Sequence, residues 1–322
     1  MTETSTRTIS IITPAWREEK NLPVLYERLC TTIDAMPNTE WEWIIVDDHS
    51  PDGTFSCIHA LSQKDSRVKG VRLSRNSGSH TALTCGLNQA TGDCAVVLAA
   101  DLQDPPETIP ALLDEWEDGT QVVWAVRTAR PGESVATRGF ARIYYWIMRK
   151  IVGLKDIPAQ GADFLLMDAK VVEAFNRFNE SNVSIMSLIT WMGFKQGRIE
   201  YVKEARLHGK SGWTFRTKFK LVVDSITSFT YLPIRMMSVT GFIVALLGFL
   251  YALYVVYVRI TQGLTTGFAA TMVAILVIGG LQMMMMGVLG EYLWRSLDES
   301  RRRPRYMIEE QTESMNRECD SK

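Results

Sequence analysis

A short apolar run that ends in polar residues is the first stretch that could do chemistry. Residues 96–107 read VVLAADLQDPPE, so a strand-like segment leads into Asp101 and Gln103 and then into two prolines. Carboxylate and amide oxygens suit Mg²⁺ or Mn²⁺, and such ions often bind substrate phosphates directly. The same letters also form a good polar turn, and Ala99 stands where a second acid would complete a pair. The stretch predicts either a metal site with one acid missing or a strand that ends in a turn.

Two other stretches carry acids beside apolar runs. WEWIIVDD (41–48) ends in Asp47 and Asp48, which could accept hydrogen bonds from a base or a ribose or could cap the next helix. GADFLLMD (161–168) buries Asp163 in an otherwise apolar run. We expect Asp163 to be either an acid near a reacting centre or a solvated loop residue.

Basic residues in the second half could grip phosphate. Arg127 ends the run VVWAVR, and Arg138 follows it; the two could bind one phosphate through bidentate hydrogen bonds or could simply face solvent. RLHGKSGWTF (206–215) is a glycine-containing basic loop with Arg206 and Lys210. It could close over a diphosphate or only link two elements.

The elements that must position these residues alternate between strands and helices. Strands are predicted over 8–13, 41–48, 68–74 and 94–100, and helices over 18–36 and 78–91, with another helix after the turn HSPDGT. This alternation predicts a parallel, doubly wound sheet, in which ligands bind beyond the carboxyl ends of the strands. Three strand ends carry notable polar groups, at 14–18, 47–48 and 101–104. One shared site at that edge is the simplest hypothesis.

Several classes of protein are disfavoured by composition and motifs. A formal net charge of −1 gives no reason to expect nucleic acid as a partner. No Gly-x-Gly-x-x-Gly or Walker loop follows the first strand, which argues against a dinucleotide enzyme or a P-loop ATPase. The five cysteines are scattered and odd in number, as suits a reducing compartment. The N-terminal residues show no apolar signal-peptide region.

The C-terminal third contains two long uncharged stretches. Residues 236–258 and 268–290 are each long enough to cross a bilayer as a helix, and only RITQGLTTG separates them. Arg235, Arg295 and the run RRRPRY (301–306) flank the outer ends, whereas the connecting loop holds only Arg259. The positive-inside rule therefore predicts a transmembrane hairpin with both termini in the cytoplasm.

Two basic aromatic segments precede this hairpin. Residues 137–154, TRGFARIYYWIMRKIVGL, mix aromatic and aliphatic residues with arginine and lysine at nearly helical spacing. They form either an ordinary core helix with a basic outer face or an interfacial helix that lies on anionic membrane lipid. Residues 213–235 resemble a second such element that leads into the membrane.

Taken together, the motifs resemble the family-2 glycosyltransferases that act on polyprenyl phosphate, in particular bactoprenol glucosyltransferases and dolichyl-phosphate mannose synthases. The motifs occur in family order across almost the whole chain: TPAWREEKNLPVLYERL, IIVDDHSPDGT, LSRNSGSHTALTCGL, AADLQDPPE, GADFLLMD, WMGFKQGRIEYVKEAR, DSITSFTYLPIR and GEYLWRSLDESRRRPRY. The resemblance implies a type A glycosyltransferase fold, a Rossmann-like α/β fold with a doubly wound, mostly parallel sheet, interfacial helices and a two-helix transmembrane hairpin. It implies a cytoplasmic catalytic domain over 1–212, a juxtamembrane segment over 213–235, the hairpin over 236–290 and a basic tail over 291–322.

The resemblance also implies roles for single residues. Pro14, Glu18 and Asp48 should line the nucleotide-sugar pocket, and Asp101 and Gln103 should bind Mg²⁺ or Mn²⁺. The acceptor phosphate should meet the basic residues Arg127, Arg138, Arg206 and Lys210. Asp163 should lie at the sugar or at the acceptor oxygen, so that Asp101, Asp163 and Arg127 form the catalytic set.

The sequence departs from the family pattern at four places. Trp16 and Arg17 replace the usual Tyr-Asn before Glu18, and His49 replaces the glycine that usually follows Asp48. Gly212 stands at a position where a lysine is common, and Lys210 is its possible substitute. Ala99 replaces the first acid of an Asp-x-Asp pair.

The activity implied by the resemblance is an inverting transfer of glucose from UDP-glucose to undecaprenyl phosphate at the bacterial inner membrane. The product would supply an O-antigen-type modification of lipopolysaccharide or another surface glycan. A flippase and a periplasmic transferase would be pathway partners, and a homo-oligomer, a tetramer by resemblance, is expected. UDP-N-acetylhexosamine and GDP-mannose are alternative donors.

Two alternative functions remain open. A catalytically degenerate membrane scaffold is the alternative that Ala99 supports. A processive polysaccharide synthase is disfavoured, because such enzymes carry a late Gln-x-x-Arg-Trp motif and more membrane spans.

Overall fold

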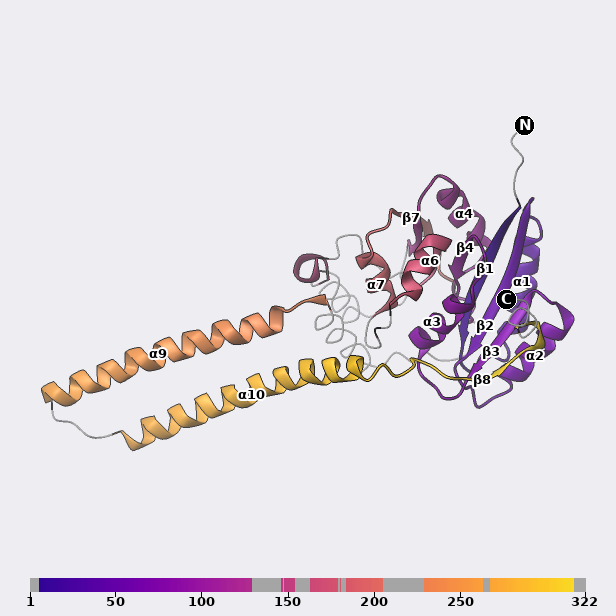
Figure 1. Ribbon diagram of the computed structural model, residues 1–322. Helices are drawn as coiled ribbons and strands as arrows, with labels where there is room; N and C mark the ends of the chain where they lie inside the picture. The colour runs from indigo at the N-terminus through magenta and orange to yellow at the C-terminus, as the bar shows by residue number, and fades with distance from the viewer. Residues whose placement is uncertain are drawn as a thin grey trace. The chain divides into compact units, whose positions relative to one another are not determined.

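Two compact units make up the chain (Figure 1). The structure, a computed structural model, describes residues 6–128, 146, 148–153, 163–178, 180, 184–204, 229–262 and 267–315. The first unit comprises Met1–Val222 together with Pro304–Lys322, and the second comprises Val223–Arg303. The chain therefore leaves the first unit, forms the second and returns to the first.

An eight-stranded mixed sheet lies at the centre of the first unit, in the spatial order β7-β5-β6-β4-β1-β2-β3-β8. Its strands are β1 (Arg7–Ala15), β2 (Thr39–Asp47), β3 (Val68–Leu73), β4 (Cys94–Val97), β5 (Val122–Arg127), β6 (Leu165–Asp168), β7 (Gln196–Tyr201) and β8 (Ile308–Gln311). The strands β4, β1, β2 and β3 run parallel, as do β5 and β7. By contrast, β6 and β8 are antiparallel to the strands they pair with. The predicted doubly wound α/β architecture is confirmed, with two antiparallel strands added.

The central strands are buried because both of their faces are covered. Ile9, Ile11, Trp43 and Ile45 have no exposed surface, as expected for nearly continuous apolar runs in a parallel sheet. The strand expected over 94–100 is shorter and ends at Val97. Leu98 still donates its N–H to Ile12 O at 3.0 Å, and the chain then turns away before Asp101. The polar residues that follow β4 therefore lie in a turn and not on the strand.

Short helices connect the strands (Figure 1). They are α1 (Leu22–Ile33), α2 (Thr54–Lys64), α3 (Ser79–Gln89), α4 (Ile109–Glu117), α6 (Ala169–Asn176) and α7 (Ile185–Trp191), with a 3₁₀ turn at Pro106–Thr108 and a π-helical turn at Met148–Val152. In α1, a proline in the first turn favours the helix start, and Leu22, Leu25, Leu29 and Ile33 form the buried face. The first strands and helices thus form where the periodicity of apolar residues predicts them.

The C-terminal residues of the first unit form a strand that the sequence analysis did not anticipate. β8 pairs antiparallel with the outer edge of β3, with Val71 opposite Gln311 and Leu73 opposite Ile308. Just beyond β8, Thr312 exchanges two hydrogen bonds with Gly70, N to O at 3.0 Å and Gly70 N to Thr312 Oγ1 at 2.9 Å. A Cβ at Gly70 would lie 2.8 Å from Thr312 Cγ2, so only glycine permits this approach. Ile308–Gln311 therefore form an edge strand of the sheet, and Thr312 extends the contact with β3.

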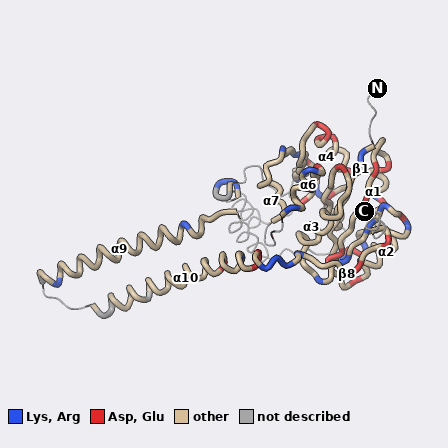
Figure 2. Tube along the Cα trace, in the orientation of Figure 1, with Lys and Arg blue, Asp and Glu red and all other residues tan. Residues whose placement is uncertain are grey.

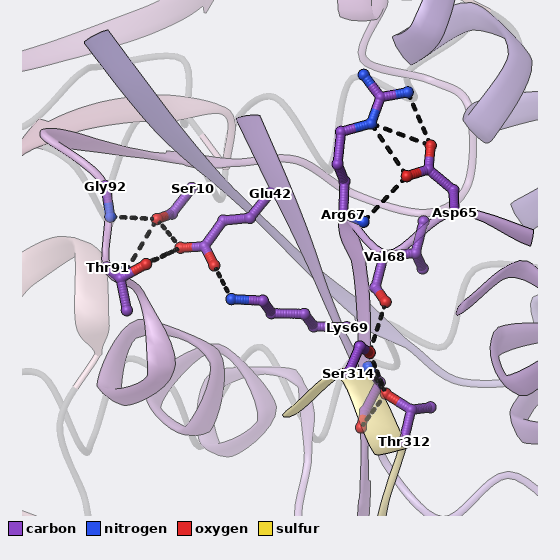
Figure 3. A network of polar contacts seen from close by, with 11 residues as sticks. Ser10, Glu42, Asp65, Arg67, Val68, Lys69, Thr91, Gly92, Thr312 and Ser314 are labelled. Atoms are coloured by element: carbon purple, nitrogen blue, oxygen red, sulfur yellow. Dashed lines mark hydrogen bonds and ion pairs between the residues drawn. The ribbon is translucent and has the colours of Figure 1, made fainter. Parts of the chain in front are cut away.

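A buried polar network ties the amino-terminal ends of the strands together (Figure 3). Glu42 on β2 accepts a hydrogen bond from Lys69 Nζ on β3 at 2.7 Å, and both side chains are only 7% exposed. Its carboxylate also accepts from Ser10 Oγ and, at 2.9 Å, from Thr91 N. Burial by itself raises the pKa of Glu42, but the hydrogen bonds from Lys69, Ser10 and Thr91 outweigh it, so the pKa lies below its usual value.

We expect Lys69→Met to lower the free energy of unfolding of the first unit by about 3–5 kcal/mol, because it leaves a buried carboxylate without its cation. Arg177→Met, which breaks the exposed Arg177–Glu173 pair, should cost less than about 1 kcal/mol. Denaturant unfolding followed by tryptophan fluorescence compares the two variants. The contribution of Glu42 should be present above pH of about 4.3 and lost as the pH falls through its lower folded pKa. Equal stabilities for both variants would contradict this role of the pair.

The second unit consists of two long apolar helices, α9 (Leu232–Gln262) and α10 (Phe268–Ser300). Both are long and apolar enough to cross a membrane, with mean hydropathies of 2.3 and 2.2 over their candidate spans. Figure 2 shows both helices tan along most of their length, and a basic stretch with Arg301, Arg302 and Arg303 follows α10. The helices extend beyond the predicted 236–258 and 268–290, because helical hydrogen bonding continues into the polar flanks.

Most of the predicted interfacial segments lies outside the described residues. Of 137–154, the structure describes Trp146 and residues 148–153, where Met148 is buried. Of 213–235, it describes 229–235, and α9 already begins at Leu232. The predicted interfacial helices remain predictions.

Candidate active site

The carboxyl ends of β1, β2 and β4 lie side by side because these strands are parallel neighbours. Each end is followed by a non-glycine residue in the left-handed region: Arg17 with φ 62°, His49 with φ 59° and Leu102 with φ 58°. Such a backbone conformation costs on the order of 1–3 kcal/mol per residue and clusters at functional sites. The strain therefore marks the same edge of the sheet that the sequence predicts as the site.

His49 stands where the resembled family usually has glycine, and its positive φ gives the reason for that preference. The imidazole Nδ1 lies 3.1 Å from Leu73 O and 3.1 Å from Glu309 Oε2 on β8. Arg72 Nε also lies 3.2 Å from Glu309 Oε2. Contacts to β3 and β8 thus hold a side chain at a position where glycine would fit without strain.

The acids at the end of β2 fix the neighbouring loops. Asp48 accepts hydrogen bonds from Ser77 N at 2.7 Å and Gly78 N at 2.8 Å, and Asp47 accepts one from Ser50 N at 3.0 Å. Burial raises the pKa of both carboxyls despite these hydrogen bonds. Neither acid caps α2, whose N-cap residue is Gly53. The capping alternative is therefore wrong, and Asp48 shapes the loop between β3 and α3.

Pro14 and Glu18 lie at the adjacent end of β1. Pro14 pairs with Val46 within the sheet, next to the Ala15–Asp47 pair. Glu18 donates its N–H to Thr54 Oγ1 at 3.0 Å, and its carboxylate accepts from Asn21 Nδ2. The structure therefore brings Pro14, Glu18 and Asp48 to the ends of two neighbouring strands.

The predicted metal ligands occupy the turn after β4. Asp101 is nearly buried, and its Oδ1 accepts a hydrogen bond from Gln103 N at 3.2 Å. Leu102, between them, takes the left-handed conformation that reverses the backbone. Gln103 O accepts from Glu204 N at 2.8 Å. Asp101 and Gln103 thus belong to one turn, which is hydrogen-bonded to the segment that follows β7.

The oxygen donors of this turn fit a divalent ion that also binds substrate. Among the described residues, no group of three or more His, Cys, Asp and Glu side chains could hold a metal ion by itself. A carboxylate accepts up to about four hydrogen bonds or metal contacts, so the bond from Gln103 N does not by itself prevent Asp101 from binding a metal. Mg²⁺ commonly uses one or two carboxylates and completes its shell with waters and substrate phosphates. The residues present therefore fit a metal ion whose remaining ligands are waters and phosphate oxygens of a bound substrate.

Arg127 is the last residue of β5, and Asp163 lies two residues before β6 begins. Their side chains form an ion pair. Arg127 Nη2 lies 3.2 Å from Asp163 Oδ2; the side chains are 17% and 66% exposed, respectively. Burial opposes the charge on Arg127, but Asp163 and nearby groups raise its pKa overall. The expectation that Asp163 is buried is wrong, because it precedes β6, which begins at Leu165. Arg138, Arg206 and Lys210 lie outside the described residues.

Two residues of this region, Asp104 and Tyr201, received no role from the sequence, although Asp104 belongs to the polar group at 101–104. Asp104 is 1% exposed and accepts a hydrogen bond from Tyr201 OH, and its Oδ2 has no hydrogen-bond partner among the described residues. Burial raises the pKa of Asp104, and the negative charges of Asp101 and Asp163 add to that effect. The sequence signal for Asp104 was its place in that polar group after β4, and Tyr201 gave no such signal.

Comparisons with known proteins place the chain in a family. Residues 10–175 match the model of glycosyl transferase family 2, and residues 232–295 match the GtrB C-terminal hairpin. The chain is 35% identical to the bactoprenol glucosyl transferase of Shigella phage SfX, over 93% of this chain and 98% of that protein. It is 36% identical to the uncharacterized glycosyltransferase YkcC of Bacillus subtilis, over 93% of each chain.

The fold has a counterpart among solved structures. Glucosyl-3-phosphoglycerate synthase from Mycobacterium tuberculosis, in complex with Mn²⁺, UDP-glucose and phosphoglyceric acid, superimposes with a TM-score of 0.50 at 15% identity. The match covers 68% of this chain and 78% of that one. The type A glycosyltransferase fold expected from the sequence is confirmed. The chain belongs to glycosyl transferase family 2 and is a glycosyltransferase that carries a C-terminal hairpin of two apolar helices.

Proposed function

We propose that the protein transfers glucose from UDP-glucose to undecaprenyl phosphate with inversion at the anomeric carbon. The observation that carries this proposal is the similarity to proteins named bactoprenol glucosyl transferase, which spans 93% of the chain and includes the hairpin. UDP-N-acetylhexosamine and GDP-mannose are the competing donors. Trp16, Arg17 and His49, which depart from the family pattern beside the nucleotide residues, are where a different donor would be selected.

The donor binds at the ends of β1, β2 and β4 in this proposal. Pro14, Glu18 and Asp48 line the nucleotide pocket, and Asp101 and Gln103 hold Mg²⁺ or Mn²⁺ against the diphosphate. A divalent ion bound there supplies positive charge that stabilises the departing diphosphate. Support comes from the shared edge of the sheet and from the strained turn at Leu102.

The acceptor phosphate binds beside Arg127, with Arg138, Arg206 and Lys210 as further cations. A phosphomonoester has a second pKa of about 6, so it is largely dianionic at neutral pH and needs little help from a general base. Its oxygen attacks the anomeric carbon as the bond to UDP breaks, so an α-linked donor gives a β-glucosyl phospholipid. Asp163, exposed and paired with Arg127, then orients the arginine or the substrate and removes no proton.

The membrane parts serve the acceptor. We propose that α9 and α10 form a hairpin in the bacterial inner membrane with both termini in the cytoplasm, since arginines flank the outer ends. Residues 1–212 form the catalytic domain, and 137–154 and 213–235 lie on anionic lipid, where the phosphate of a polyprenyl chain emerges. A homo-oligomer, a flippase and a periplasmic transferase for an O-antigen-type glycan complete the proposed pathway.

Incubating membranes that contain the protein with labelled nucleotide sugars and undecaprenyl phosphate tests this function. Label from UDP-glucose should enter the lipid fraction, EDTA should stop the transfer, and Mg²⁺ or Mn²⁺ should restore it. Preferred use of UDP-N-acetylhexosamine or GDP-mannose would reassign the donor. No transfer from any of the three donors would support a membrane scaffold, the alternative that Ala99 suggests.

A further inference from the structure

The segment that ends β7 holds the turn with the proposed metal ligands. Tyr201 OH donates to Asp104, and Lys203 Nζ lies 3.4 Å from Asp104 Oδ1. Glu204 N donates to Gln103 O at 2.8 Å. Residues 201–204 therefore contact the turn through side chains and backbone at two successive positions, 103 and 104.

Arg28 on α1 strengthens this attachment. Its guanidinium donates two hydrogen bonds to Glu107, at 2.9 and 2.6 Å, and two to Glu204, both at 3.0 Å. Glu107 follows the turn of Asp101 and Gln103, and Glu204 follows β7, so one arginine joins both segments. Bidentate arginine–carboxylate contacts fix orientation as well as distance.

Tyr201 also connects to the proposed acceptor side of the site. It pairs in register with Arg127 across β5 and β7, and its carbonyl oxygen accepts from Thr128 N at 3.0 Å. Its ring packs edge-on against Phe164, the neighbour of Asp163, with centroids 5.7 Å apart. One buried tyrosine thus contacts the turn of Asp101 and Gln103 through its hydroxyl and the strand of Arg127 through its backbone.

We propose that Tyr201 and Asp104 are positioning residues that hold the metal-binding turn at a fixed place relative to Arg127. This inference rests on the proposed function, since it assigns the two sides of the site to donor and acceptor. Asp104 Oδ1 accepts a hydrogen bond from Tyr201 OH and lies 3.4 Å from Lys203 Nζ. The end of β7 and the residues just after it therefore hold the Asp104 carboxylate in place. Without the tyrosine hydroxyl, the turn keeps its backbone contacts but loses a buried side-chain hydrogen bond to β7.

Tyr201→Phe tests the inference, because it removes the hydroxyl and keeps the ring against Phe164. A matched control is Tyr26→Phe: Tyr26 OH donates to Asp65 at 2.9 Å and its ring stacks on Trp43, and neither partner is one of the proposed site residues. We expect Tyr201→Phe to lower kcat about 10- to 100-fold, the range for loss of a hydrogen bond to a charged group. Tyr26→Phe should leave kcat within about twofold, since it touches no proposed site residue. Both variants should lose similar thermal stability.

Binding of Mn²⁺ in the presence of UDP, followed by electron paramagnetic resonance, gives a readout independent of transfer. Tyr201→Phe should weaken that binding about fivefold or more relative to Tyr26→Phe, because the ligand turn is less fixed. Asp104→Asn keeps an acceptor for Tyr201 and should have a smaller effect. That effect comes from the Asp104 charge beside Lys203 Nζ, 3.4 Å from Oδ1, and not from the tyrosine hydroxyl.

The outcomes separate this inference from the proposed function. If wild-type protein transfers no sugar to the lipid but Tyr201→Phe still weakens Mn²⁺ binding, the function fails and the positioning role stands. If Tyr201→Phe and Tyr26→Phe match in kcat and in Mn²⁺ binding, the positioning role is wrong.

Discussion

Asp101→Ala should eliminate measurable sugar transfer, a loss of at least about 1000-fold in kcat, which is the scale for removing a major electrostatic contact to the departing group. The reason is local. Asp101 is the single acid of the predicted ligand pair, and Ala99 offers no second carboxylate to take over its role. The other predicted ligand, Gln103, is neutral and would hold a cation weakly by itself.

A second variant is needed, because the Asp101 carboxylate also accepts a hydrogen bond from Gln103 N and so supports the turn itself. Asp101→Asn keeps an acceptor for that hydrogen bond but removes the charge. It should be nearly as inactive as Asp101→Ala, whereas Asp114→Asn, at an exposed acid on α4, should retain wild-type rates. Transfer of labelled glucose to lipid measures all three. Activity of Asp101→Ala within tenfold of wild type would contradict the metal role.

Ala99→Asp adds the acid that the family pattern usually has. Ala99 is only partly buried, in the turn that leads to Asp101. A carboxylate there should be tolerated and should lower the concentration of Mn²⁺ needed for half-maximal rate. A loss of activity in Ala99→Asp would mean that this turn cannot accept a second ligand.

Arg127→Lys should have the second largest effect, with kcat/KM for the polyprenyl phosphate falling about 100-fold, equivalent to about 2.7 kcal/mol. Lysine keeps the charge but cannot form the two parallel hydrogen bonds that a guanidinium makes to phosphate. It also cannot reproduce the placement beside Asp163 and β7 that the mostly buried guanidinium has. The loss should fall on the acceptor.

Binding of UDP and Mn²⁺ to Arg127→Lys should remain within about threefold of wild type, because the substitution removes no contact to the donor. Arg177→Lys is the matched control: Arg177 is exposed and pairs with Glu173 one helical turn away. It should leave both acceptor and donor parameters unchanged. An Arg127→Lys enzyme with normal acceptor kinetics would show that another cation binds the lipid phosphate.

The spacing of apolar residues predicts the first helices and strands well, because each of them depends on residues that lie close together in the sequence. The helix around Leu25 and Leu29 and the strands around Ile11 and Ile45 each bury residues in the spacing that their sequence shows. The convergence of Asp48 and Asp101 at one edge also follows, because parallel strands end together. Apolar length alone indicates the two long helices.

Contacts between distant segments could not be predicted in this way. The antiparallel insertion of β6 beside β4 and the pairing of β5 with β7 depend on long-range partners that no local pattern specifies. The hydrogen bond from Tyr201 to Asp104 joins residues 97 positions apart. The left-handed turn at Leu102 is strained, and a leucine gives no signal for it. These features appear at the site, where tertiary contacts override local preference.

The return of the chain to the sheet as β8 has a consequence for how the protein is made. The outer edge of β3 stays open until the ribosome has synthesised α9, α10 and the residues of β8. An open strand edge presents unpaired N–H and C=O groups, which invite pairing with other chains. The two long apolar helices are therefore synthesised before the sheet can be completed. A soluble fragment cut before Leu232 would lack β8, and joining residues 304–315 to that fragment through a flexible linker should reduce its aggregation.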